Sequence, residues 1–296
     1  MFNRKELKAN AKLVLKRSYW MAFLVSLLAG LVTGGSGFSG NLNLNNSNVN
    51  SLSEDTQQLE AISDGSTEAI QQFFAENGGV VAAVVGVTFI VALLIGFAWA
   101  FFVSTPAEIG LSRFFIATRE QQNPVDFSYV LYGFKYNYLK QAWAHFSTQL
   151  IIMLWSLLGV IPMIIGGILS AVTQNGNWMA LGVFMLPLMI PSIIKTYQYR
   201  MVSYILANNC NINGKRAREL STEMTNGNKW NLFVLDLSFI GWIILGALAC
   251  GIGILFVIPY INATNAEAYT CLKAEAMQNK GISGDEELPS LAGAAV

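Results

Sequence analysis

The sequence predicts an all-α fold, a polytopic transmembrane helix bundle of about six spans with both termini in the cytoplasm. Apolar residues make up 53% of the chain and charged residues 12%, against roughly 25% charged in soluble domains. Several apolar runs are longer than a buried core helix, which favours membrane spans. The basic residues are also unevenly placed, since no Lys or Arg occurs between Arg17 and Arg113 or between Lys140 and Lys195.

Residues 1–17 form a predicted basic amphipathic cytoplasmic arm. Its apolar side chains fall on one helical face, with lysines elsewhere, and this face consists of Leu7, Ala11, Val14 and Leu15. Such a helix can lie on an anionic membrane surface, and the alternative is a solvated helix whose charges only orient the first span. We expect residues 18–34 to be an uncleaved first span rather than a signal peptide, because no A-x-A site follows.

The next segment, 35–78, is predicted to be a polar extracytoplasmic loop, partly disordered because Asn, Ser and Gly dominate its first half. Its second half is acidic, but the acids lack EF-hand spacing, so a solvated surface is favoured over a calcium site. A five-span helical membrane domain is then expected over 79–276, and a flexible tail over 277–296. Two cytoplasmic loops are expected within that domain, at 104–141 and 208–231. The cations and aromatic residues of the loop 104–141 suit the membrane interface.

The five-span domain begins with the second span of the chain, expected at 79–103. The third and fourth spans are expected at 142–172 and 178–196, with kinks at their prolines. Asn213-Gly214 predicts a turn before a short helix, and Gly227 predicts the end of that helix.

The last apolar stretch has no charged residue between Asp236 and Glu267. As one helix this stretch would be about 45 Å long, against a hydrocarbon core of roughly 30 Å. The sequence "ACGIG" near its middle favours a reversal, and we expect two helices, about 231–249 and 253–276. This arrangement places both acids at similar depths on one side. All Lys and Arg residues then lie on that side, which the positive-inside rule assigns to the cytoplasm.

Charged and amide side chains inside spans are costly and therefore suggest a functional site. We expect a polar cavity open to the cytoplasm, lined by Lys195, Asp236, Asn262, Asn265 and Glu267. Glu267 lies toward the C-terminal end of its helix, where the dipole disfavours an acid, so it needs a partner, with Lys195 or Arg200 as candidates. The alternatives are interhelical hydrogen bonds and ion pairs that only hold the bundle together, or side chains that snorkel to the headgroups.

The motifs of common enzymes are missing from the sequence. It contains no H-E-x-x-H, G-x-S-x-G, P-loop or Rossmann glycine pattern, and its three cysteines lack metal-ligand spacing. We therefore predict no catalytic residues, no metal and no cofactor. His145, the one histidine of the chain, is expected at a span edge in an interfacial role.

Five stretches of the chain resemble a family of uncharacterised bacterial multi-pass membrane proteins, domain of unknown function 975, common in Gram-positive bacteria. They are "GLSRFF", "YGFKYNYLKQ", "PSIIKTYQYRMVSYIL", "NGNKWNLFVLDLSFIGW" and "GIGILFVIPYINATNAEAY". The similarity covers roughly residues 1–34 and 79–273. The chain departs from the pattern at Ser192, where the family usually has Gly, and in a longer segment around 160–185. The resemblance implies a membrane location and a bacterial origin, and it brings no known activity.

The function expected from the sequence is a non-enzymatic membrane module, located in the cell membrane, that binds a lipid, peptide or protein partner. The alternative is a small transporter or permease-like protein with a cytoplasm-facing polar cavity. An intramembrane enzyme that uses Asp236 and Glu267 ranks last, because no nucleophile or metal set accompanies them. The expected partners are the lipid bilayer and a membrane protein, and the zero net charge gives no reason to expect nucleic acid.

Overall fold

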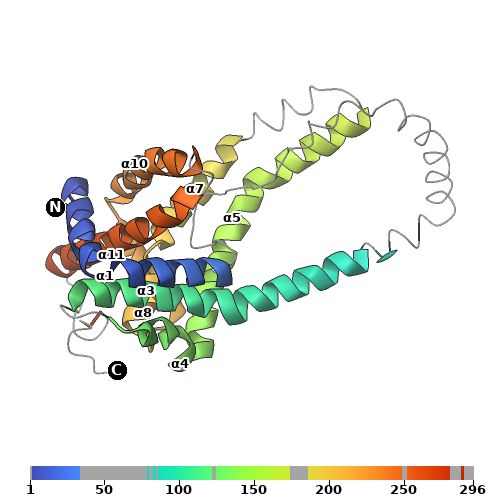
Figure 1. The fold of residues 1–296 in the computed structure, drawn as a ribbon. Coiled ribbons are helices and arrows are strands. Elements are labelled where there is room, and N and C mark those ends of the chain that lie inside the picture. The colour runs from blue at the N-terminus through green and yellow to red at the C-terminus, as the bar shows by residue number, and fades with distance from the viewer. Residues whose placement is uncertain are drawn as a thin grey trace, which may run out of the picture. The chain divides into compact units, whose positions relative to one another are not determined.

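The structure is a computed structural model, which describes residues 2–33, 79, 83–84, 86–121, 125–173, 186–248, 252–280 and 288–289. The regular elements of these residues are all helical, with no strand among them, so the predicted all-α class is confirmed. The chain divides into two compact units, Phe38–Trp99 and the remainder, Met1–Gly37 with Ala100–Val296. The packing described below lies within the second of these (Figure 1).

Four of the described helices are long and apolar enough to cross a membrane: Arg4–Val32, Gly86–Glu120, Tyr138–Thr173 and Lys229–Leu248. The fourth predicted span, 178–196, lies partly outside the described residues. Its described part consists of a short 3-10 turn, η3 (Leu186–Met189), followed by α7 (Ile190–Tyr199). The predicted loop 35–78 lies outside the described residues. The predicted tail, 277–296, also lies outside them, except for residues 277–280 and 288–289.

Helix α1 (Arg4–Val32) combines the predicted arm and the predicted first span. The two parts meet at a kink where Ser18 has a φ of −140°, next to the boundary expected from the sequence. Leu7, Ala11 and Leu15 of the arm are buried, and α1 packs along α11 (Figure 1). The apolar face of the arm is therefore covered by the protein itself, rather than by lipid headgroups or solvent as expected.

The first half of the expected loop 104–141 is a helix. A π-helical segment, η1 (Ala100–Ser104), leads directly into α3 (Thr105–Glu120). Pro106 has no N–H for the carbonyl of Phe102, four residues back, and that carbonyl accepts a hydrogen bond from the Tyr138 hydroxyl instead (2.7 Å). A 3-10 turn, η2 (Phe127–Leu131), and the short α4 (Tyr132–Lys135) follow and pack on α3.

Two glycines make this packing possible. A Cβ on Gly110 would lie 1.8 Å from the Val130 carbonyl oxygen, and a Cβ on Gly133 would lie 2.2 Å from that of Pro106. Both neighbours are backbone atoms, which cannot move aside as a flexible side chain can. The close contact between α3 and the η2–α4 segment therefore requires residues without a side chain.

Helix α5 (Tyr138–Thr173) begins before the expected residue 142 and continues through Pro162. After α7, the chain turns at Arg200 into α8 (Val202–Asn208). The next helix, α9 (Gly214–Thr225), begins where the sequence predicts, with the Asn213 side chain accepting a hydrogen bond from the Lys215 N–H. Gly227 follows α9 with a φ of +89°, which suits glycine at a helix end.

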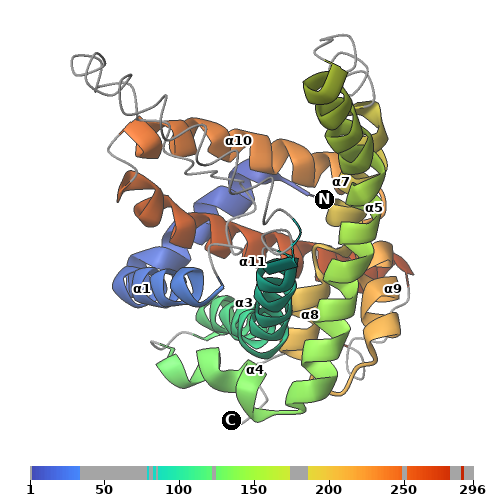
Figure 2. The same cartoon turned by 90° about the vertical axis from the view of Figure 1, so that its right-hand side faces the viewer.

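The last apolar stretch forms two helices, α10 (Lys229–Leu248) and α11 (Ile252–Lys280), rather than one. They pack against each other, as Figure 2 shows. Near the reversal, a Cβ on Gly253 would lie 2.7 Å from the Cα of Gly246. The two backbones thus touch without intervening side chains, in the manner of small residues at helix interfaces in membranes.

Candidate functional site

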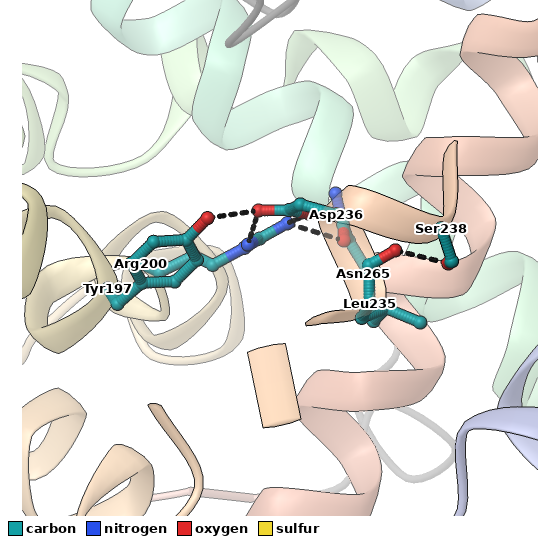
Figure 3. Close-up of polar contacts among 6 residues, drawn as sticks. All are labelled: Tyr197, Arg200, Leu235, Asp236, Ser238 and Asn265. Atoms are coloured by element: carbon teal, nitrogen blue, oxygen red, sulfur yellow. Dashed lines mark hydrogen bonds and ion pairs between the residues drawn. The ribbon is translucent and has the colours of Figure 1, made fainter. Parts of the chain in front are cut away.

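A polar cluster joins α7, α10 and α11 (Figure 3). Arg200 donates from both terminal nitrogens to the two carboxylate oxygens of Asp236, with Nη2 to Oδ1 at 2.7 Å. The Tyr197 hydroxyl donates to Asp236 Oδ2 (2.9 Å), and Arg200 Nη2 also donates to Asn265 Oδ1 (2.9 Å). We call these four residues the Arg200 cluster. Its bidentate pairing is the strong, directional form of an ion pair.

The break between α7 and α8 places Arg200 in this cluster. The Gln198 carbonyl, next to the break, accepts hydrogen bonds from the hydroxyls of Ser221 (2.8 Å) and Thr225 (3.3 Å) of α9. The Met201 N–H donates to Ser221 Oγ (3.2 Å). Side chains of α9 therefore satisfy backbone groups that a continuous helix would pair internally. These contacts stabilise the break on both sides of Arg200.

The Arg200 cluster is only partly enclosed, because the Asp236 side chain is 35% exposed and that of Arg200 18% exposed. Behind it, Tyr204 of α8 is buried and stacks on Tyr269 of α11 at 5.4 Å between ring centroids. Burial raises the pKa of Tyr204 above its usual range, although the nearby Arg200 opposes the shift. Tyr204 is therefore a neutral phenol near neutral pH, and the positive charge of Arg200 is balanced by Asp236 alone among its hydrogen-bond partners.

A second ion pair joins α3 to α11. The carboxylate of Glu267 is 5% exposed and accepts a hydrogen bond from Arg119 Nε at 3.2 Å. Arg119, rather than Lys195 or Arg200, is thus the partner that the position of Glu267 requires. The Arg119 side chain is 35% exposed, so this pair joins a buried acid to a cation near the surface of the unit.

The structure brings together two of the five residues predicted to line a cavity. Asp236 and Asn265 meet at Arg200. Lys195 lies between the rings of Trp155 (5.6 Å) and Tyr199 (5.5 Å). Asn262 donates to Ser26 Oγ of α1 (3.4 Å), and Glu267 belongs to the pair with Arg119. Each polar residue of the set therefore has its own partner on another element.

His145, expected at an interface, is buried near the start of α5. Its Nε2 lies 3.6 Å from Glu108 Oε1 of α3, and its Nδ1 has no hydrogen-bond partner among the described residues. One turn later, Arg218 of α9 donates to Ser147 (3.0 Å) and Thr148 (3.5 Å). The beginning of α5 is thus tied by polar contacts to α3 on one side and to α9 on the other.

The arrangement pairs charges between neighbouring helices. Within the described ranges, no three His, Cys, Asp or Glu side chains gather closely enough to hold a metal ion. Sequence reasoning missed Arg119 and Tyr197 as partners. Arg200 did carry a signal, because it is a cation at the end of an apolar segment and therefore needs an anion, but sequence spacing does not identify which one.

A family model described as "Protein of unknown function (DUF975)" matches residues 1–276. No curated protein matches the chain. No solved structure matches it either.

Proposed function

Since the chain belongs to the DUF975 family, whose description supplies no activity, we propose from its geometry that it is a non-enzymatic membrane module that binds a lipid, peptide or protein partner. We place it in the cytoplasmic membrane of a bacterium as a multi-pass protein. The observation that carries the proposal is the pairing of two acids with arginines of neighbouring elements, Asp236 with Arg200 and Glu267 with Arg119.

Paired charges of this kind stabilise a fixed arrangement of helices. A solute pathway needs polar groups that are open to the solute, whereas these acids accept hydrogen bonds from Arg and Tyr residues of neighbouring helices. The outward surface of α5 is apolar instead, with Leu154 65% and Ile164 55% exposed. An apolar surface of this kind requires lipid or an apolar partner to cover it.

We further propose six spans with both termini in the cytoplasm, because the positive-inside rule then places all Lys and Arg on one side. The antiparallel contact of α10 and α11 supports the last reversal. The test is labelling of single cysteines at Asn226 and Gln278, in a chain whose three native cysteines are replaced by serine. We expect a membrane-impermeant reagent to reach both positions only after the cell is opened. Labelling of one position in intact cells would refute the topology.

Crosslinking in cells tests the binding function directly. A photoreactive amino acid at Leu154 or Ile164, on the exposed face of α5, is expected to capture a defined partner that co-purifies with the protein. The matched control is the same amino acid at Ala144, which is buried beside α9. Equal products from exposed and buried positions, or lipid adducts of no defined composition, would count against a specific partner.

A transporter is the second candidate, and the partial exposure of Asp236 favours it. Pro259 also lies inside α11, a helix that contributes to the Arg200 cluster, and interrupted helices occur at transporter sites. Reconstituted vesicles separate the two functions. A transporter should lose solute flux in an Asp236→Asn variant, whereas a binding module should show no Asp236-dependent flux and should retain its crosslinked partner.

A further inference from the structure

A second cationic site lies apart from the Arg200 cluster, where α3 meets η2 and α4. A pocket of about 140 Å³ opens there, and its lining includes Arg113, Ser128, Tyr129, Leu131, Tyr132 and Lys135. We call it the Arg113 pocket. Arg113 belongs neither to the Arg200 cluster nor to the Arg119–Glu267 pair.

Arg113 is a buried cation that makes no ion pair with a described carboxylate. It is 5% exposed, and no carboxylate of the described residues lies within ion-pair distance of it. Its Nη1 donates to the Ala207 carbonyl (2.7 Å), whereas its Nε has no acceptor among the described residues. A buried charge is costly unless an anion balances it. Glu120 favours the charge of Arg113 only from beyond ion-pair distance, so a bound anion in contact with the guanidinium would stabilise it further.

Tyr132, the phenol stacked on Arg113, cannot supply a negative charge. The Arg113 guanidinium lies over the ring of Tyr132 at 3.8 Å, which holds the guanidinium plane and leaves its edge for hydrogen bonds. Burial raises the pKa of Tyr132 far above its usual range, as does its hydrogen bond to Cys210. Tyr132 is therefore a neutral phenol at physiological pH.

The rim of the pocket adds a second cation and an apolar wall. Lys135 is exposed, forms no ion pair within the described part of the chain, and lies over the ring of Tyr136 at 5.3 Å. Leu131 is 51% exposed and Phe134 42% exposed beside it. Cations next to exposed aromatic and aliphatic side chains match an amphiphile, with an anionic head at the cations and apolar chains along the surface.

We propose that the Arg113 pocket binds a phosphate group, supplied by the headgroup of an anionic phospholipid. Arg113 and Lys135, both in the lining, provide the positive charge. The Ser128 hydroxyl in the same lining donates to Asp126 Oδ2 (3.3 Å) and is not counted as a ligand of the phosphate. Arginine suits this ligand because its planar donors match phosphate oxygens. The inference rests on the proposed membrane location and deepens the proposed function, because it names the chemistry of one bound partner.

The full-length protein in detergent provides the test, with phosphatidylglycerol, diacylglycerol and inorganic phosphate as three separate probes. Bound lipid is counted by native mass spectrometry, and each apparent Kd follows from the shift of the thermal unfolding midpoint. We expect phosphatidylglycerol to bind, and diacylglycerol, which has the chains without the phosphate, to bind at least tenfold more weakly.

Three variants locate the binding. Arg113→Gln is expected to weaken phosphatidylglycerol binding at least tenfold. Lys135→Gln, at an exposed position that folding tolerates, is expected to weaken it about fivefold, the effect of one lysine near an anionic surface. Lys215→Gln removes another exposed lysine, at the start of α9, and should leave the Kd unchanged.

Unchanged binding in Lys135→Gln and in folded Arg113→Gln would overturn the proposal, as would equal binding of diacylglycerol. If inorganic phosphate binds as tightly and is lost in the same variants, the phosphate site stands and a lipid source is excluded. Crosslinking from α5 is independent of this pocket. Partner capture with no lipid effect therefore refutes this inference alone, and lipid binding with no captured partner limits the proposed function to lipid.

Discussion

Helix α3 buries 13 of its 16 residues, whereas α5 buries seven of 36, although α5 is much the more apolar of the two. Among the buried residues of α3 are Thr105, Ser112 and Arg113. The same reversal occurs within α5, where Gln141, His145 and Thr148 are buried near its beginning and the apolar remainder is mostly exposed. In water the apolar helix would be the one in the core.

The difference between α3 and α5 is the one expected when lipid is the solvent. Lipid tails are as apolar as leucine, so apolar side chains gain little by turning inward. Polar groups gain most from the interior, because only protein offers them hydrogen bonds there. High hydropathy in α5 therefore goes with exposed surface, as expected of a surface that faces lipid, and polar residues such as Arg113 and His145 are buried.

The largest effect is expected from Gly110→Ala in α3. The new Cβ would lie 1.8 Å from the Val130 carbonyl oxygen, so α3 and the η2–α4 segment must separate. We expect a loss upwards of about 3 kcal/mol in the free energy of unfolding, at the upper end for overpacked sites. Protein recovered from membranes and its unfolding midpoint measure this loss.

The matched control for that variant is Gly167→Ala in α5, where a Cβ would meet no other atom within 4 Å. This exchange should be neutral or stabilising, because alanine favours a helix by up to about 1 kcal/mol over glycine. Equal losses in both variants would mean that α3 is not the tightly packed interior of the unit.

A lysine in place of Leu154, near the middle of the exposed part of α5, tests the lipid-facing side of the comparison. A charge at the centre of a span costs about 2.5–3.5 kcal/mol on insertion scales. We therefore expect Leu154→Lys to reduce membrane insertion strongly, measured with glycosylation-site reporters. Leu13→Lys on the arm, at an equally exposed residue, should insert normally. Normal insertion of both variants would show that the exposed face of α5 lies outside the bilayer.

Double-mutant cycles compare the two ion pairs. For Arg200→Met with Asp236→Asn we expect a coupling of about 1–2 kcal/mol, because two nitrogens and a tyrosine hydroxyl hold this carboxylate. For Arg119→Met with Glu267→Gln we expect about 0.5–1 kcal/mol, because there is one contact and the arginine is a third exposed. Unfolding midpoints in detergent are the measurement. A larger coupling for the second pair would reverse the ranking.

The smallest effect is expected at the joint between α7 and α8. Ser221→Ala removes the acceptor of the Met201 N–H and one donor to the Gln198 carbonyl, and it should cost about 1 kcal/mol. Ser156→Ala, whose hydroxyl bonds only a carbonyl of its own helix, should change stability by less than half of that. If the two variants behave alike, α9 does not support the break that orients Arg200.

Local signals in the sequence predicted local features of the fold. The glycines near residue 252 predicted the reversal between α10 and α11, and Asn213 with Gly227 predicted the limits of α9. Such features depend on a few adjacent residues and their backbone preferences. The sequence predicted about six spans, and the structure has four sufficiently long apolar helices among the described residues. The six spans and their orientation remain proposals.

Pairings between distant segments could not be predicted in the same way. Arg119 and Glu267 are 148 residues apart, and their meeting depends on how α3 packs against α11. The burial of α3 was also missed, because its mixture of polar and apolar residues suits an interfacial helix as well as a polar interior. One signal was present, since Arg113 lies alone within the apolar sequence "GLSRFF".

The contact between Gly246 and Gly253 has a consequence for biogenesis. With backbone against backbone at these two glycines, α10 and α11 form a hairpin with no bulky group at the point of contact. Two helices packed in this way can insert into the membrane together, as a helical hairpin, rather than one after the other.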